Sequence, residues 1–165
     1  MKQLAFSLLV SLVLVFWASC VSPARIYVVR HAEKAGAMSS DPPLTSAGTA
    51  RAEHLSFLLK NKNIRHIYST NTTRTISTAK SLADALGLAV EVYGHDTLSV
   101  FLNKIKASGK NALVVGHSNT VLSIVSALGV KPSIKEIGDG EYDNLFEVRF
   151  NKKGGKAPRL LEKKY

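Results

Sequence analysis

The chain has 165 residues, a formal net charge of +10 and 45% apolar residues. This length is typical of one domain, and the apolar content excludes a disordered chain. The positive charge indicates attraction of nucleic acid or of small anions and anionic surfaces. Only Tyr165 in the basic carboxyl-terminal stretch 151–165 could stack on a base. We therefore interpret this stretch as a solvated basic end and expect no nucleic-acid partner.

Residues 1–24 have the order of a secretory signal peptide. Lys2 is followed by an apolar run, 4–18, and then by small residues. The run is shorter than the roughly 20 apolar residues of a stable membrane span, and a domain of this size could hardly bury it as a helix that is apolar all round. We therefore expect residues 25–165 to form the folded domain of an exported protein, periplasmic or tethered to the membrane. An uncleaved anchor is the alternative.

Cys20 is the only cysteine, so the predicted domain contains neither a disulfide nor thiolate chemistry. The sequence Ala18-Ser19-Cys20 resembles a lipoprotein attachment site, although Trp17 stands where an aliphatic residue is usual. Cleavage after Ala24 competes with this interpretation. A lipid on Cys20 is the only membrane contact that we expect, and we expect a monomer.

Beyond residue 25, short apolar runs alternate with amphipathic stretches. The predicted strands are 26–29, 64–68, 88–93, 112–115 and 145–150, the last paired with 159–161. The predicted helices follow Thr45 and Thr72 and cover the leucine-rich stretches 98–108 and 121–128. Strands that alternate with helices of this length form right-handed crossover units. The sequence therefore predicts an α/β fold, a three-layer sandwich whose mostly parallel central sheet has helices on both faces.

Polar residues with a common chemistry follow the predicted strands. In open parallel sheets, ligands bind beyond the carboxyl ends of the strands, beside helix N-termini that favour anions. The residues at these ends are Arg30 and His31, Ser69 and Arg74, His95 and Asp96, and His117 and Asn119. Two arginines and two histidines would thus meet at one edge of the sheet, which predicts a phosphate pocket.

These residues resemble three motifs of the histidine phosphatase superfamily, also called phosphoglycerate mutase-like. The segment 29–34 resembles its Arg-His-Gly motif, with Ala32 in place of glycine. The segment 69–79 resembles its second motif, and Gly116-His117 resembles the third. The segment 43–48 also resembles the usual lead into the first helix. The resemblance runs from about residue 25 to 150.

The resemblance implies a phosphomonoester hydrolase that forms a phosphohistidine on His31. A neutral imidazole is a good nucleophile near pH 7. Arg30 and Arg74 suit phosphate because guanidinium offers a planar, bidentate fork. His117 would donate to the equatorial oxygens during transfer. We expect a small phosphorylated substrate, no cofactor and no metal ion.

Other residues of the expected site are less sharply defined. Asp96 is the tentative general acid because it stands closest to the position where many relatives carry one, with Glu33 and Glu91 as alternatives. Some small relatives lack the acid and act on substrates with good leaving groups. Ser69 and Asn119 are expected to add hydrogen bonds to the phosphate. We interpret 141–144, before the last strand, as a turn.

Other functions leave different patterns. A serine hydrolase of the Gly-x-Ser-x-Gly type orders its triad Ser, acid, His, and no histidine follows His117. The five histidines show no paired metal-ligand spacing. Two alternatives stay open: a phospho-ligand binding module of the same fold, and a phosphoglycerate mutase-type phosphotransferase.

Overall fold

The computed structural model describes residues 23–36, 39–94, 97–150 and 157–165. They form six strands and four helices in α/β order: β1 Ala24–Arg30, α1 Ser46–Leu59, β2 Ile64–Ser69, α2 Thr73–Leu86, β3 Val90–Val92, α3 Leu98–Ser108, β4 Asn111–Gly116, α4 Ser118–Ala127, β5 Asn144–Phe150 and β6 Arg159–Lys164. The predicted signal peptide, Cys20 and Asp96 lie outside the described residues, apart from the last two residues of the signal.

The strands form one mixed sheet in the order β3-β2-β4-β1-β5-β6. The first four in this order are mutually parallel, whereas β5 runs antiparallel to both β1 and β6. Each crossover helix carries the chain back across the sheet before the next parallel strand begins. The strands β1, β2 and β4 therefore all end at one edge of the sheet. We call this the carboxyl edge and the opposite one the amino edge.

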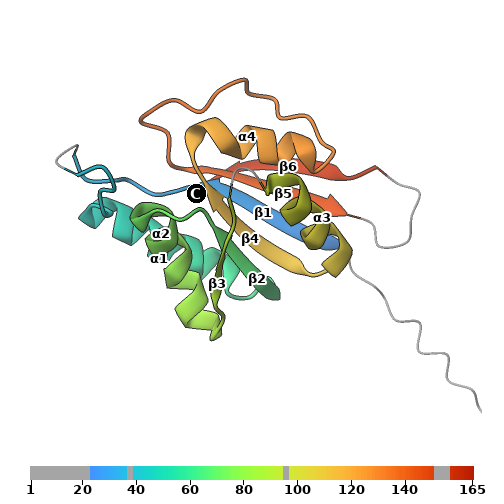
Figure 1. The fold of residues 1–165 in the computed structure, drawn as a ribbon, viewed down its shortest axis with the longest axis horizontal. Coiled ribbons are helices and arrows are strands. Elements are labelled where there is room, and N and C mark those ends of the chain that lie inside the picture. The colour runs from blue at the N-terminus through green and yellow to red at the C-terminus, as the bar shows by residue number, and fades with distance from the viewer. Residues whose placement is uncertain (1–22, 37–38, 95–96, 151–156) are drawn as a thin grey trace, which may run out of the picture.

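The helices form two layers around the sheet. Figure 1 shows α1 and α2 on one face and α3 and α4 on the other. Each layer has its own buried cluster: Leu55 and Leu82 pack against one face, and Phe101 and Ile124 pack against the other. The structure confirms the predicted three-layer sandwich with a mostly parallel sheet.

Local chemistry explains several element boundaries. Thr45 is the N-cap of α1, and its hydroxyl accepts a hydrogen bond from the backbone N–H of Gly48 at 3.0 Å. Gly87 ends α2 with φ +63°, a left-handed conformation that favours glycine. The predicted strand 88–93 is shorter in the structure, where β3 spans only Val90–Val92.

The carboxyl-terminal stretch corrects one expectation. Part of the segment interpreted as a solvated basic end is β6, which pairs with β5 along its length, from Asn144 opposite Lys164 to Arg149 opposite Arg159. The pairing predicted for 159–161 is therefore confirmed, and it extends further. Backbone hydrogen bonding to β5 offsets the high charge of this segment.

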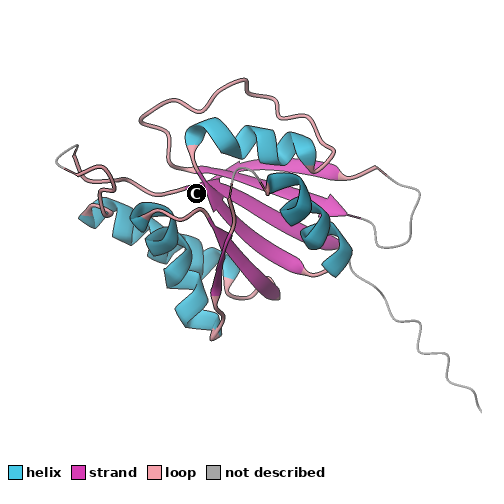
Figure 2. Cartoon of the chain, in the orientation of Figure 1, coloured by secondary structure: helices cyan, strands magenta, loops and turns pink. Residues whose placement is uncertain are grey.

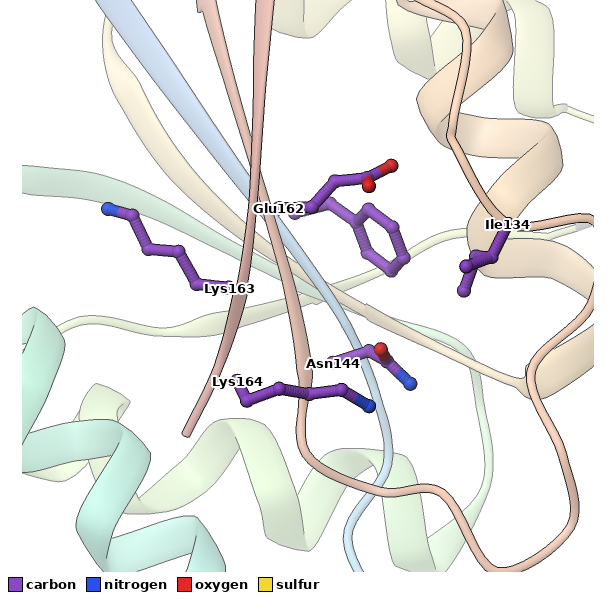
Figure 3. A pocket seen from close by; sticks show the side chains of 6 residues that line it. Ile134, Asn144, Glu162, Lys163 and Lys164 are labelled. Carbon is purple, nitrogen blue, oxygen red and sulfur yellow. The ribbon is translucent and has the colours of Figure 1, made fainter.

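Side chains of β6 alternate between the two faces. Figure 3 shows Lys163 projecting away from the side on which Glu162 and Lys164 border a small cavity of about 210 Å³. The connection from α4 to β5, drawn as a long loop in Figure 2, contributes Ile134 to that cavity. Within the described part of the chain, no helix combines the length and the apolar character needed to span a bilayer.

Candidate active site

Arg30, the last residue of β1, is held by the loop before β5. Its side chain is buried, with the residue 4% exposed, and Nη1 donates to the carbonyl oxygens of Gly138 at 2.7 Å, Asp139 at 3.0 Å and Glu141 at 3.2 Å. The Tyr142 ring lies against the guanidinium, with 4.3 Å from its centroid to Cζ. Aromatic and carbonyl contacts thus fix the position of a buried cation.

His31 follows directly and is equally buried, at 3% exposed. Its Nδ1 lies 2.7 Å from the carbonyl oxygen of Ala32. A carbonyl can only accept, so Nδ1 carries the proton and the lone pair of the neutral ring lies on Nε2. The backbone N–H of His31 donates to Gly116 at 2.9 Å, which ties the end of β1 to the end of β4.

The environment of His31 keeps its ring neutral. Burial, followed by the electrostatic effects of Arg30, His117 and Arg74, lowers the pKa of the imidazole from 6.5 to about 4, against the raising effect of the Ala32 carbonyl. At neutral pH the ring therefore retains its lone pair.

Arg74 stands in the first turn of α2, beside the N-terminus of that helix. Its Nη1 lies 3.3 Å from Oδ1 of Asp41, a carboxylate that also accepts from the backbone N–H and the hydroxyl of Thr73. The hydrogen bonds from Thr73, followed by the charge of Arg74, lower the pKa of Asp41, so it is a carboxylate at neutral pH. The buried Nε of Arg74 has no partner among the described residues and is available to a bound oxyanion.

His117 follows β4 and caps α4. Its Nε2 lies 2.9 Å from the hydroxyl oxygen of Thr70. The Thr70 hydroxyl donates to Thr75 at 3.0 Å, and the Thr75 hydroxyl donates onward to backbone carbonyls. With the Thr70 proton used in this way, its oxygen accepts from His117, and the neutral His117 ring carries its proton on Nε2. Burial, Arg74 and Arg30 lower the pKa of His117, whereas Asp41 raises it.

These groups converge on one cavity. The two histidine rings meet edge to face, with 5.4 Å between their centroids. The cavity measures about 390 Å³, and its lining is strongly basic: Arg30, His31, Lys34, Arg74, His117, Ser118, Asn119 and Asp139. A site with two guanidinium groups, two imidazoles and the N-termini of two helices suits a phosphate group.

Of the two residues predicted to add hydrogen bonds to the phosphate, one lines the cavity and the other does not. Asn119 lines the cavity. Ser69 does not: it is fully buried, and its hydroxyl donates to the carbonyl of Thr70 at 2.8 Å. This corrects its assignment to phosphate binding, because the neighbouring backbone already uses its only proton. The position of Asp96 lies outside the described residues.

The two alternative acids are engaged elsewhere. Glu33 accepts two hydrogen bonds from Nε and one from Nη2 of Arg51, and these hold its pKa low. Glu91 lies on β3, where it pairs with Lys104 at 2.7 Å and with His66 at 3.3 Å. Neither carboxylate lines the cavity.

The sequence did not predict two parts of the site: Asp41, and the loop whose carbonyl oxygens bind Arg30. Residues 141–144 were interpreted only as a turn. The signal that could have found the loop is the orientation of β5. An antiparallel strand starts at the edge where its parallel neighbours end, so the loop before it must reach the site.

Comparison with known proteins agrees with this geometry. Residues 26–99 match the model of the histidine phosphatase superfamily (branch 1). Over 72 residues the chain is 38% identical to proteins of Yersinia pestis and Yersinia pseudotuberculosis that are named probable phosphoglycerate mutase GpmB. That alignment covers 40% of this chain and 34% of each relative, so the chain spans about a third of the relatives' length.

Solved structures share the fold over most of the chain. The protein histidine phosphatase SixA complexed with tungstate has a TM-score of 0.68 at 20% identity and covers 85% of this chain and 96% of its own. A mycobacterial glucosyl-3-phosphoglycerate phosphatase has a TM-score of 0.65 at 14% identity and covers 86% and 98%. Residues 26–99 are thus similar to the histidine phosphatase superfamily, and the described chain shares the fold of these solved phosphatases.

Proposed function

We propose that this protein is a phosphomonoester hydrolase that works through a phosphohistidine on His31. The observation that carries the proposal is the state of that ring. Its Nδ1 proton is bound to the Ala32 carbonyl at 2.7 Å, and its pKa is lowered to about 4. A nucleophile is therefore ready at Nε2 inside a pocket built for an oxyanion.

The reaction follows from this placement. Nε2 of His31 attacks phosphorus, the P–N bond forms, and the ester P–O bond breaks as the alcohol leaves. Arg30 and Arg74 stabilise the negative charge on the phosphoryl oxygens, and His117 lines the pocket beside them with its Nε2 proton held by Thr70. Water then attacks the phosphohistidine, which releases phosphate and restores the neutral ring.

We assign the proton for the leaving oxygen to Asp96. Glu33 and Asp41 are held as anions by their partners, and an anion cannot donate a proton, which leaves Asp139 at the cavity wall as the described alternative. Asp96→Asn should slow an alkyl phosphate far more than p-nitrophenyl phosphate, because general acid catalysis contributes about 10²–10⁴-fold and nitrophenolate leaves unaided. Equal losses on both substrates would remove Asp96 from the mechanism.

The decisive experiment compares two histidine variants of the full chain. His31→Ala should abolish turnover of p-nitrophenyl phosphate while the far-UV circular dichroism stays unchanged. His54→Ala, a control on the exposed side of α1, should retain full activity. Rapid quenching of the wild type should trap phosphate that is labile in acid and stable in alkali. Full activity of a folded His31→Ala variant would overturn the proposal.

The same preparation separates the alternatives. We propose a metal-independent reaction, so turnover should survive a chelator. Because the curated relatives are named probable phosphoglycerate mutases, isomerisation of phosphoglycerate is assayed beside hydrolysis. Isomerisation faster than hydrolysis would identify a mutase, and binding of phosphate esters without turnover of any would identify a binding module.

A further inference from the structure

Three arginines form a row across neighbouring strands at the amino edge, opposite the active site. Arg25 of β1 pairs in register with Arg149 of β5, and Arg149 pairs with Arg159 of β6. Residues that pair directly share a face of the sheet, so the three side chains lie side by side. Like charges placed opposite one another destabilise a sheet, which makes this row costly unless an anion meets it.

The protein supplies one carboxylate to this row. Glu147 is buried, at 1% exposed, and pairs with Arg149 at 2.7 Å, Lys163 at 2.7 Å and Arg25 at 3.6 Å. Among the described residues, Arg159 has no acidic partner within 4.0 Å. One negative charge among four cations leaves the cluster positive.

The helix-to-strand connections extend this positive charge along the same edge. Lys60 and Lys62 lie between α1 and β2, and Lys110 lies between α3 and β4. All three are exposed. Lys62 also borders a cavity of about 300 Å³ that Arg25 and Arg149 line. We call Arg25, Lys60, Lys62, Lys110, Arg149 and Arg159 the basic edge.

Acidic residues gather instead in the loops around the active site. Those on or beside the carboxyl edge are Glu33, Asp41, Asp139, Glu141 and Asp143. The acids beside the pocket offset part of its basic charge, whereas the basic edge has Glu147 as the carboxylate that pairs with two of its arginines. A negatively charged plane would attract the exposed cations of the basic edge.

We propose that the basic edge docks the protein on an anionic phospholipid membrane, with the catalytic pocket facing away from the lipid. Guanidinium groups recognise headgroup phosphates through their bidentate fork, and each basic side chain near an anionic membrane adds to binding. The sequence supports a membrane over nucleic acid, because β1 begins at this edge only six residues after the apolar run 4–18. The pocket then stays open to phosphate esters in solution.

The test measures sedimentation of the full chain with vesicles of phosphatidylcholine alone and with added phosphatidylglycerol. The binding gained from phosphatidylglycerol is the quantity compared, so that binding through the apolar run 4–18 cancels. The wild type should gain binding that weakens as salt is raised. Lys62→Gln with Arg159→Gln should lower the gain about thirtyfold, at the typical contribution of each membrane-facing cation.

A charge-matched control separates the basic edge from net charge. Lys80→Gln with Lys135→Gln removes the same charge from exposed positions on α2 and on the connection before β5, and the gain should persist. Equal losses in both double variants, or no gain in the wild type, would overturn the proposal. Equally tight, edge-dependent binding to duplex DNA would also overturn it by indicating a nucleic-acid surface. Turnover of a soluble aryl phosphate should stay at the wild-type level in both variants, which keeps this test independent of the catalytic one.

Discussion

His31 combines a fixed tautomer with a depressed pKa. The carbonyl of Ala32 holds the Nδ1 proton, while burial and neighbouring cations oppose a second proton on the ring. The hydrogen bond to Ala32 places the lone pair on Nε2, and the depressed pKa keeps that lone pair unprotonated. The surroundings of His31 therefore both orient the ring and keep it nucleophilic.

The depressed pKa of His31 predicts how the ring titrates and how stability depends on pH. We expect its NMR titration in the ligand-free chain to have a midpoint near pH 4. Because the folded pKa lies below that of the unfolded chain, His31 favours folding above about pH 6.5, and this contribution of about 3 kcal/mol is lost as pH falls to 4. Urea unfolding across this range should show the loss, and His31→Gln should reduce it. A midpoint near 6.5 would contradict the account.

Thr70 is expected to position His117 through the bond of 2.9 Å between Oγ1 and Nε2. Thr70→Val keeps the shape but leaves the Nε2 proton without an acceptor, which costs about 1–3 kcal/mol. If the proposed function holds, kcat should fall by about tenfold to a hundredfold, and Thr70→Ser should restore it. The ¹⁵N spectrum of His117, which is independent of turnover, should show the Nε2–H tautomer in wild type and Thr70→Ser and a mixture in Thr70→Val. The same spectrum in all three would rule out this role.

At the scale of elements, the N-terminus of α1 is locked to the segment that follows His31. The backbone N–H of Thr45 donates to the carbonyl of Glu33 at 2.9 Å, and Lys34 pairs with Leu44. Gly48 makes this approach possible, because an added Cβ would lie 2.2 Å from the Glu33 carbonyl oxygen. The catalytic strand and α1 are thereby joined beside the nucleophile.

Gly48→Ala should therefore destabilise the protein. Backbone on both sides of the contact has to shift, which costs about 1–3 kcal/mol as for other overpacked sites. Thermal unfolding followed by circular dichroism measures the change. Gly36→Ala is the matched control, because a Cβ there meets nothing within 4 Å. Equal melting temperatures for Gly48→Ala and the wild type would show that the contact relaxes freely.

At the scale of the whole molecule, the catalytic residues and the start of β1 lie at opposite edges of the sheet. The parallel strands carry the catalytic residues at their carboxyl ends, and the chain enters β1 at the opposite end. If the preceding segment directs export or holds the protein at a membrane, the active site therefore projects outward.

The amino-terminal segment predicts processing that intact-mass analysis can measure. We expect the mature protein from its native host to lack at least residues 1–19. A diacylglycerol mass on Cys20 would establish the lipoprotein, whereas an N-terminus at Arg25 would establish free export. An uncut chain in the cytosol would contradict both outcomes.

The sequence by itself determined the layers of the fold and four residues of the pocket. Apolar periodicity distinguishes strands from helices, and crossover connections bring the ends of the parallel strands to one edge, so the sequence alone placed Arg30, His31, Arg74 and His117 together. Asn119 was predicted on the same ground.

Only the tertiary structure decided which polar atoms face the phosphate. Ser69 stands at a strand end, but its hydroxyl turns to the backbone, whereas Thr70 next to it reaches His117. The loop 138–142 and Asp41 join the site through contacts over 108 and 33 residues of sequence. Such partners depend on strand direction and side-chain rotamers, and local residue patterns encode neither of these over such distances.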